Sequence, residues 1–301
     1  MIHFKSNVIL IPVDFSETSL LAIKHGAFLA QLTKGDVHLI HVINRHYESY
    51  VLIGQAVTLD LTSKMTTTVT NKLNELAGAI KSEYGVNVNC IVAEGNPTSE
   101  IIKTAKEVKA SLIVMGTHGY SPLEELVIGS NALKVITKSN CPVMAMSEKA
   151  TKLGYNNILL PIDTSEHTKQ KVNYTMELAK HFSAHVHCVG ILADDEENKK
   201  PGFEVIMSQV KTIAKEKGVN CTSEILTGVK NRAVTTINHG QRVKADCIVI
   251  MTDQDAELSG FFLGPYSQQV IHLAKVPVIA VKPEEHPENI NFSLLSGTSG
   301  L

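Results

Sequence analysis

The chain contains the same sequence pattern twice, and this internal repeat constrains its fold more than any other feature. The segments that begin at Asn7 and Asn157 match once one residue is gapped. Farther along, Ala110–Met115 and Cys141–Val143 recur at a common offset of 135 residues without a gap. This period is far longer than the roughly 20–50 residues of a solenoid repeat, so each copy is predicted to be a whole domain.

Length and composition agree with two ordinary globular domains. The chain has 301 residues, of which 44% are hydrophobic, and its net charge is −2. Aromatic residues make up only 5%, with no Trp, so neither the charge nor base stacking points to nucleic acid or to acidic membranes. The five cysteines lack a CxxC spacing, which favours reduced thiols. With no signal-like start and no apolar run of membrane length, the expected location is the cytoplasm.

Apolar runs alternate with helix-period segments in each half. Such alternation predicts a parallel sheet with right-handed crossovers, so each half is expected to be an open parallel-sheet α/β sandwich. Residues 44–66 show no clear period and are interpreted as a surface excursion, with a lid as one possibility. In the first half the predicted strands are Val8–Val13, Val37–Ile43, Val86–Ala93, Ser111–Met115 and Val143–Ser147, and the predicted helices run from Ser16 to Gly35, Thr66–Tyr84, Ser99–Lys109 and Asn131–Lys138.

The repeat also gives domain limits. We predict one domain over residues 1–148, a second over 155–283, and a poorly ordered tail over 284–301, with a short polar join near Glu148–Tyr155. The last strand of each domain follows a proline, at Pro142 and Pro277, and is predicted to be an edge strand. An exposed edge of this kind needs a partner.

A glycine-rich loop follows the predicted strand that ends at Met115. Gly116 and Gly119 would let the main chain approach a ligand closely and adopt positive φ. Gly129 then precedes Ser130 at the start of a helix, where unpaired N–H groups favour phosphate oxygens. Because no lysine directly follows Gly129, and the first cationic residue after Gly116 is Lys134, a triphosphate would be met by amides, a hydroxyl and a bound Mg²⁺. This arrangement suits holding a nucleotide better than hydrolysing it.

The spacing Gly-x2-Gly-x9-Gly-Ser from Gly116, together with Pro12-Val-Asp and His41-Val-Ile at the first two strands, resembles the universal stress protein family, specifically its ATP-binding branch. The resemblance covers nearly the whole chain as two tandem copies. It implies Rossmann-like domains of the adenine nucleotide alpha-hydrolase type, with ATP, ADP or AMP and Mg²⁺ as ligands. Family members with one domain dimerise through the last strand, so a tandem chain would form an intramolecular pseudo-dimer, with a homodimer also open.

The resemblance also implies a role for individual residues. The adenosine would lie against Pro12, Val13, Asp14 and Val42, with Met115 and Gly116 near the ribose and phosphates. The phosphate chain would be cradled by Gly119, Gly129, Ser130, Asn131 and Ala132. Asn131 departs from the family, which commonly has a small or β-branched residue there. For Asp14 the alternative interpretation is an ordinary helix-entry residue, since Asp163 persists at the same place in the second half.

The second copy of the loop is degenerate. Met251 and Gln254 bring side chains into the space of two glycines, and Pro265 removes an N–H group at the helix start. Carboxylates at Asp253, Asp255 and Glu257 would also repel a triphosphate. We therefore predict that the second domain does not bind ATP in the manner of the family.

Three functions remain open from the sequence. The first is a non-catalytic stress-response regulator that binds ATP and signals to an unidentified protein partner. The second is a slow Mg²⁺-dependent ATPase, with His118 or residues 44–66 placing a water, and the third is an interaction scaffold without nucleotide. A histidine-rich stretch, His181 to Cys188, could resemble a metal cluster, but on a strand His185 and His187 share one face while Cys188 points away, so partly exposed sheet residues are expected.

Overall fold

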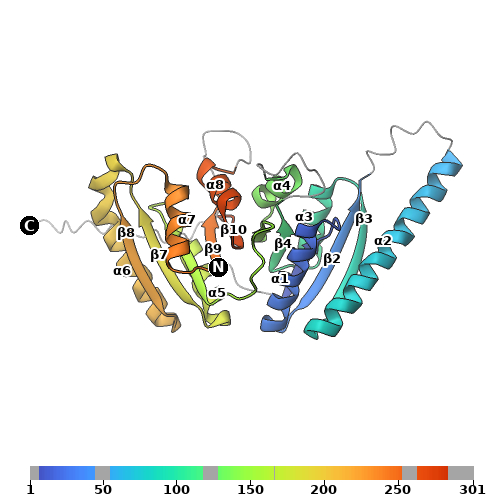
Figure 1. The fold of residues 1–301 in the computed structure, drawn as a ribbon, viewed down its shortest axis with the longest axis horizontal. Helices are drawn as coiled ribbons and strands as arrows, with labels where there is room; N and C mark the ends of the chain where they lie inside the picture. Colours follow the sequence, from blue (N-terminus) through green and yellow to red (C-terminus); the bar gives the residue numbers. More distant parts are fainter. Residues whose placement is uncertain (1–6, 45–54, 118–127, 166, 253–262, 284–301) are drawn as a thin grey trace, which may run out of the picture. The chain divides into compact units, whose positions relative to one another are not determined.

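The structure is a computed structural model that describes residues 7–44, 55–117, 128–165, 167–252 and 263–283, with the main chain alone for residues 55–63. Strands and helices alternate along the chain (Figure 1). The described residues form two compact units: a larger one within Phe4–Leu153 and Thr252–Lys282, and a smaller one from Gly154–Met251, to which Pro283 also belongs. In the described part of the chain, no helix has the length and hydropathy that a membrane crossing needs.

The sheet of the larger unit has the strand order β3-β2-β1-β4-β5-β10. Its first five strands are parallel, and β10 pairs with β5 in the antiparallel direction, with Ile279 opposite Met144. Strand β5, which follows Pro142, is the edge strand of the first repeat, as predicted, and it pairs within the chain with β10, the last strand of the second repeat, as expected. The strands are β1 Val8–Pro12, β2 Asp36–Ile43, β3 Val88–Glu94, β4 Leu112–Gly116, β5 Val143–Met146 and β10 Val278–Val281.

Helices cover both faces of this sheet. The chain moves from β1 to β2 and β3 in one direction and then crosses back to β4 and β5, so right-handed crossovers place α1 and α2 on one face and α3 and α4 on the other. In agreement, α1 contacts α2, and α3 contacts α4. The helices are α1 Glu17–Thr33, α2 Gln55–Tyr84, α3 Pro97–Glu107, α4 Ser130–Lys138 and α8 Pro265–Leu273.

Two predictions about helix ends are corrected. Helix α2 begins at Gln55, so much of the predicted excursion over residues 44–66 is helical. At the end of α1, Lys34 rather than Gly35 has the left-handed conformation, with φ 52°. Gly35 is needed for a different reason: a Cβ there would lie 2.0 Å from the main-chain oxygen of Asn7.

The smaller unit repeats this arrangement with the strand order β9-β6-β7-β8. All three of its strand pairings are parallel. The last helix and strand of the second repeat, α8 and β10, belong to the larger unit. The elements are β6 Asn157–Ile162, α5 Thr168–Phe182, β7 His185–Ile191, the 3-10 helix η3 Asp194–Lys199, α6 Lys200–Lys217, β8 Cys221–Leu226, α7 Arg232–Arg242 and β9 Cys247–Met251.

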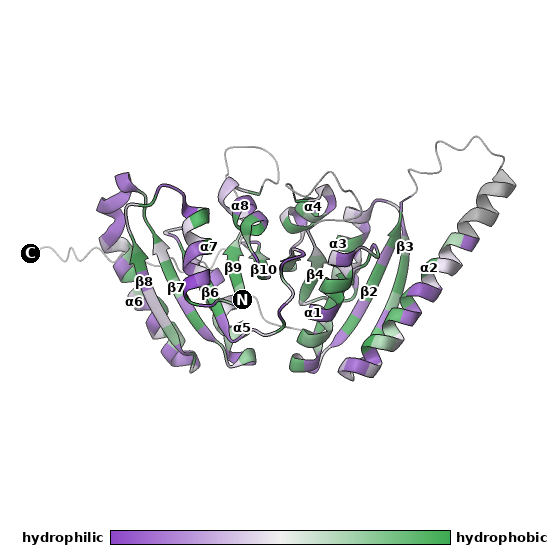
Figure 2. Ribbon diagram, in the orientation of Figure 1, coloured by the Kyte–Doolittle hydropathy of each residue, from purple (hydrophilic) through white to green (hydrophobic). Residues whose placement is uncertain are grey.

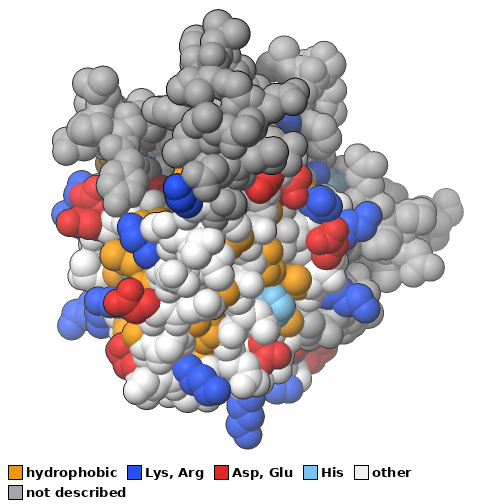
Figure 3. All heavy atoms as spheres, turned by 90° about the vertical axis from the view of Figure 1, so that its right-hand side faces the viewer, with side chains coloured by type: hydrophobic (Ala, Val, Ile, Leu, Met, Phe, Trp, Pro, Cys, Tyr) orange, Lys and Arg blue, Asp and Glu red, His pale blue; other side chains and the backbone are white. Residues whose placement is uncertain are grey.

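The core of each unit is its sheet. Every residue of β5, β9 and β10 is buried, as expected of strands covered on both faces, and Figure 2 shows hydrophobic strands between helices with polar outer sides. On the face drawn in Figure 3, positive and negative side chains are interspersed, with hydrophobic side chains between them. The polar join after Glu148 is anchored by buried Ala150 and Tyr155, and His25 Nε2 of α1 lies 2.8 Å from the Ala150 carbonyl oxygen.

Candidate functional site

A cavity of about 150 Å³ opens at the carboxyl ends of β1, β2 and β4 in the larger unit. This is where the strand order reverses direction, the usual ligand position in an open α/β sheet. Its volume is below the roughly 300–1,000 Å³ of a site that encloses a drug-sized ligand, so it would enclose only part of a nucleotide. It is lined by Pro12, Val13, Asp14, Ser19, Ile40, His41, Val42, Pro97, Ile101, Met115, Gly116 and Asn131.

The end of β2 extends past the end of β1 and exposes its main chain to this cavity. Pro12 is opposite Ile40, after which β2 continues to Ile43. The Val13 N–H donates to the Ile40 oxygen at 2.8 Å, and His41 Nδ1 donates to the Val13 oxygen at 2.6 Å. His41 therefore fixes the main chain of β1 at the cavity wall.

Asp14 lies at the cavity and also supports the start of α1. Its Oδ1 accepts hydrogen bonds from the Ser16 N–H at 2.9 Å and from Ser16 Oγ at 2.5 Å. Ser16 is the N-cap of α1, and its hydroxyl accepts from the Ser19 N–H. Asp14 therefore fits both the ligand role and the helix-entry role: one carboxylate oxygen holds the start of α1, while the exposed carboxylate faces the cavity.

Gly116 lies in the lining for a reason that differs from the prediction. Its φ is outside the positive range, so the expected left-handed conformation is wrong at this position. A Cβ at Gly116 would instead lie 2.7 Å from Thr18 Oγ1 and 3.2 Å from the Thr18 main-chain carbon. The missing side chain lets the first turn of α1 pack onto the end of β4.

Helix α4 directs its first turn toward the same region. Gly129 is its N-cap, with no side-chain cap, and the Gly129 N–H donates to the Thr117 oxygen at 2.7 Å. Thr98 Oγ1 donates to Asn131 Oδ1 at 3.3 Å, which ties α4 to α3. Among the described residues the Asn131 amide nitrogen has no hydrogen-bond partner, so Asn131 places N–H donors at the cavity.

The structure brings most of the predicted site together. Seven of the eleven predicted residues line the cavity: Pro12, Val13, Asp14, Val42, Met115, Gly116 and Asn131. Gly129, Ser130 and Ala132 form the adjoining start of α4, outside the lining. Gly119 and His118 lie outside the described residues.

Sequence reasoning missed five lining residues, Ser19, Ile40, His41, Pro97 and Ile101. His41 and Ile40 could have been predicted, since they adjoin Val42 on the predicted strand Val37–Ile43. Pro97 and Ile101 had a weaker signal: α3 starts at the same edge of the sheet because β3 ends there. None of the lining residues is Lys or Arg, so the described part of the cavity holds no positive side chain for phosphate.

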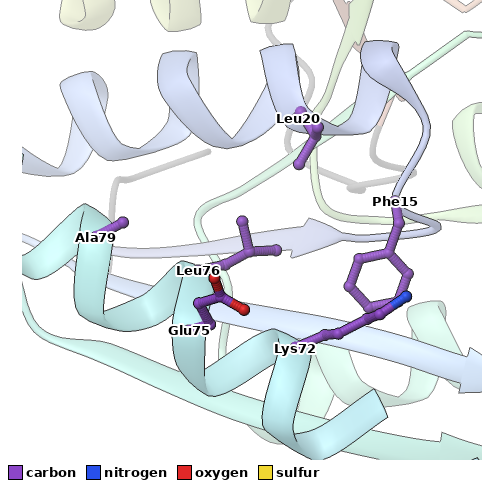
Figure 4. A pocket seen from close by; sticks show the side chains of 6 residues that line it. All are labelled: Phe15, Leu20, Lys72, Glu75, Leu76 and Ala79. Carbon is purple, nitrogen blue, oxygen red and sulfur yellow. The ribbon is translucent and has the colours of Figure 1, made fainter. Parts of the chain in front are cut away.

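A second, larger cavity of about 330 Å³ lies between α1 and α2 (Figure 4). Its lining is mainly apolar: Phe15, Leu20, Lys72, Glu75, Leu76 and Ala79. Phe15, at φ 66°, lines this second cavity, and its ring centroid lies 5.1 Å from that of His41, which lines the first. Lys72 Nζ lies 5.4 Å from the centre of the Phe15 ring, within the range of a cation–π contact.

In the smaller unit the counterpart of Asp14 is Asp163, and it forms an ion pair with a lysine of the same unit. Lys171 Nζ lies 2.6 Å from Asp163 Oδ2, and its side chain is only 3% exposed. Asp163 Oδ1 accepts from the Ser165 N–H at 2.9 Å and from the Thr168 hydroxyl. Although burial favours the neutral acid, the Lys171 ammonium and these hydrogen bonds hold the pKa of Asp163 below its ordinary value. The carboxylate equivalent to Asp14 is thus already paired.

The start of α8 differs from that of α4 in one donor. Gly264 is the N-cap, with φ −57° and ψ 154°, and Gly129 has the nearly equal values −55° and 142°. Pro265 occupies the first helical position, where Ser130 stands in α4. The two helix starts therefore share a main-chain path, but α8 lacks the N–H group of Ser130.

The histidine-rich stretch of β7 forms hydrogen bonds across the sheet. His185 and His187 lie on one face of the sheet, as predicted, with their ring centroids 4.4 Å apart. Both rings hydrogen-bond to Thr222 Oγ1. His187 Nε2 also lies 3.2 Å from Asn157 Oδ1. Burial lowers the pKa of His187, with the nearby histidines adding to the effect. Within the described ranges no three His, Cys, Asp or Glu side chains are placed to hold a metal ion.

Comparison with known proteins gives a consistent result for both repeats. The profile described as "Universal stress protein family" matches residues 5–146 and again residues 154–282. Universal stress protein MJ0577 of Methanocaldococcus jannaschii is 33% identical over 154 residues, 47% of this chain and 94% of that protein. Universal stress protein Mb2028c of Mycobacterium bovis is 20% identical over 290 residues, 92% of this chain and 98% of its own length. A universal stress protein crystal structure from Archaeoglobus fulgidus aligns with a TM-score of 0.75 at 22% identity, covering 93% of this chain and 99% of that one, and shows the same fold.

Proposed function

The chain belongs to the universal stress protein family, and from that premise we propose that its larger unit binds one adenine nucleotide and acts as a nucleotide-dependent regulator. The observation that carries the proposal is the cavity at the switch point of the sheet, which brings seven of the eleven predicted residues to one place. Its walls include strand ends, a carboxylate and a helix N-terminus, which suit a base, a ribose and phosphates respectively.

The base would lie between the ends of β1 and β2. Val13 and Val42 supply main-chain groups and apolar surface there, and His41 holds the Val13 carbonyl in place. The free side of the Asp14 carboxylate is an acceptor for a ribose hydroxyl. Adenine and ribose would therefore be recognised by fixed main chain and by one carboxylate.

The phosphates would extend from Gly116 toward the start of α4. The first N–H groups of a helix have no partner within it and attract anions, and no side chain caps α4. Ser130 adds a hydroxyl and Asn131 adds amide donors. Because no Lys or Arg lines the described cavity, we propose that Mg²⁺ accompanies the nucleotide and supplies the positive charge.

The same composition favours holding over hydrolysis. Among the described lining residues only Asp14 and His41 could take up a proton from water, and each has one atom, Asp14 Oδ1 or His41 Nδ1, engaged in a hydrogen bond that fixes the main chain. Catalysed phosphoryl transfer usually needs a cationic group as well as an aligned water. We therefore propose a binding role without rapid turnover, in a stress-response context that the family membership supports.

The test is a titration of the purified full-length protein with Mg-ATP, followed by calorimetry, for the wild type and for Ser130→Pro. This substitution copies Pro265, and the Gly129 backbone angles already suit a following proline, so the fold is expected to remain intact. It removes one N–H donor and one hydroxyl. We expect one site per chain in the wild type and affinity weaker by at least roughly tenfold in the variant, since the loss of even one hydrogen bond to a charged group costs about 1.5–3 kcal/mol.

The matched control is Pro265→Ser, which restores the donor at the equivalent place in α8 and should leave the number of sites unchanged. Two sites in the wild type would mean that the second repeat also binds nucleotide. No binding in any variant would leave the interaction scaffold as the function. Phosphate released at the rate of a working ATPase would replace the regulator with an enzyme.

A further inference from the structure

Two cysteine thiols of the smaller unit lie within contact distance of each other on neighbouring strands. Cys188 Sγ of β7 and Cys221 Sγ of β8 are 3.5 Å apart. In the register of the two strands Cys221 is opposite Val186, so the two cysteines are diagonal neighbours on one face of the sheet. Nothing in the nucleotide proposal uses this pair, which lies in the other unit.

The two thiols have different surroundings. Cys188 is buried with 1% of its surface exposed, whereas Cys221 is the first residue of β8 and is partly exposed. A hydrogen bond from the Cys188 thiol and the nearby charge of Lys211 lower the pKa of Cys221. The same hydrogen bond, together with burial, raises the pKa of Cys188. One sulfur is thus accessible and more readily a thiolate, and the other is a protected thiol beside it.

From this juxtaposition we propose that Cys188 and Cys221 form a reversible disulfide in response to hydrogen peroxide. The Cys221 thiolate attacks one peroxide oxygen, so the O–O bond breaks and Cys221 becomes a sulfenic acid while hydroxide leaves. The Cys188 sulfur then attacks the Cys221 sulfur, and water leaves with the Cys188 proton and the sulfenic oxygen. The two thiols give up two electrons in total, which reduce the peroxide to water. A small dithiol reverses the reaction by exchange, becoming a disulfide itself.

The strand geometry makes the bond easy to break again. Closing the bond brings the two Sγ atoms from 3.5 Å to about 2.0 Å, and because the cysteines are diagonal rather than directly opposite, the end of β8 moves toward β7. Among the described strands, β8 pairs only with β7, and Cys221 stands at its end, so the shift disturbs little of the sheet. Disulfides that form with strain are more oxidising and are reduced readily, as a reversible modification requires.

The test is peptide mapping of the full-length protein after treatment with hydrogen peroxide, with free thiols blocked before digestion. Trypsin would place Cys188 in the peptide 181–199 and Cys221 in the peptide 218–230. We expect these two peptides to be joined, with loss of both thiols, and to separate on adding dithiothreitol. Sulfinic acid on Cys221 without the joined peptides, a bridge to any other cysteine, or two unmodified thiols at a peroxide dose that consumes free cysteine would each overturn the proposal.

The larger unit offers a matched control. By the two strand registers Leu39 and Val88 stand where Cys188 and Cys221 stand in the smaller unit. The double variant C188L/C221V therefore introduces the side chains that occupy the equivalent positions of the larger unit. It should show no joined peptide at the same peroxide dose. Wild-type protein oxidised in concentrated urea should give several cysteine pairings. The same mixture from the native protein would show that the fold does not select this pair, which also contradicts the proposal.

Discussion

Burial of His25 should make the larger unit lose stability in mild acid. His25 on α1 is fully buried, and its Nε2 donates to the carbonyl oxygen of Ala150. Burial lowers the pKa of His25 from 6.5 to about 4, although the Ala150 hydrogen bond acts in the opposite direction. The unfolded chain therefore binds a proton at a pH where the folded chain does not, and stability falls as the pH drops from about 6.5 toward 4.

The size of the effect follows from the two pKa values of His25. Linkage with 6.5 in the unfolded chain and about 4 in the folded protein gives a loss of roughly 2 kcal/mol at about pH 5, rising to about 3 kcal/mol in stronger acid. The assay is urea denaturation, followed by circular dichroism at about pH 7.5 and about pH 5, of the wild type and His25→Gln, which keeps a donor for Ala150. The difference between the two proteins isolates His25 from other titrating groups. Parallel pH dependence in both would refute the reasoning.

Two further substitutions test packing and charge. Gly116→Ala should lower the free energy of unfolding by about 1–3 kcal/mol, because the added Cβ would meet Thr18. The control Gly78→Ala, on an open helix surface, should not destabilise the protein, and equal melting temperatures for the two variants would contradict this account. Lys171→Ala should lower the free energy of unfolding by about 1–3 kcal/mol, because the Asp163 carboxylate loses its cation. This loss should shrink in strong acid as Asp163 protonates, and an unchanged urea midpoint would show that the ion pair contributes nothing.

The sheet and the general place of the site could be predicted because the relevant signals are local. Wholly apolar runs such as Val8–Pro12 identify buried parallel strands, and the repeat carries the assignment to the second half. Parallel strands present their carboxyl ends at one edge, so Asp14, Val42 and Gly116 had to converge there. Family membership and the α/β fold are confirmed by the profile match and by the structural likeness.

The errors arose where a residue is constrained by a contact with a residue on a different element, which the sequence does not reveal. Gly116 is expected to adopt positive φ, yet its φ lies outside that range and the need for glycine comes from Thr18 on a different element. Gly35 was assigned the helix end, whereas Lys34 takes the left-handed conformation and Gly35 is required by Asn7. The sequence likewise gave no sign that Lys171 would pair with Asp163, because the two only meet once the helix has formed.

The path of the chain between the units has a consequence for folding. The chain leaves the larger unit at Leu153, builds the described part of the smaller unit up to Met251, and returns to supply α8 and β10. Residues 154–251 of the smaller unit are thus inserted into the chain of the larger unit, and the chain crosses between the units at both ends of this segment. When it is unfolded, β10 must find β5 across a long flexible loop, which costs conformational entropy; when it is folded, that loop is already shortened. Each unit therefore raises the stability of the other through the chain itself, so a core substitution in one should also lower the unfolding free energy of the other.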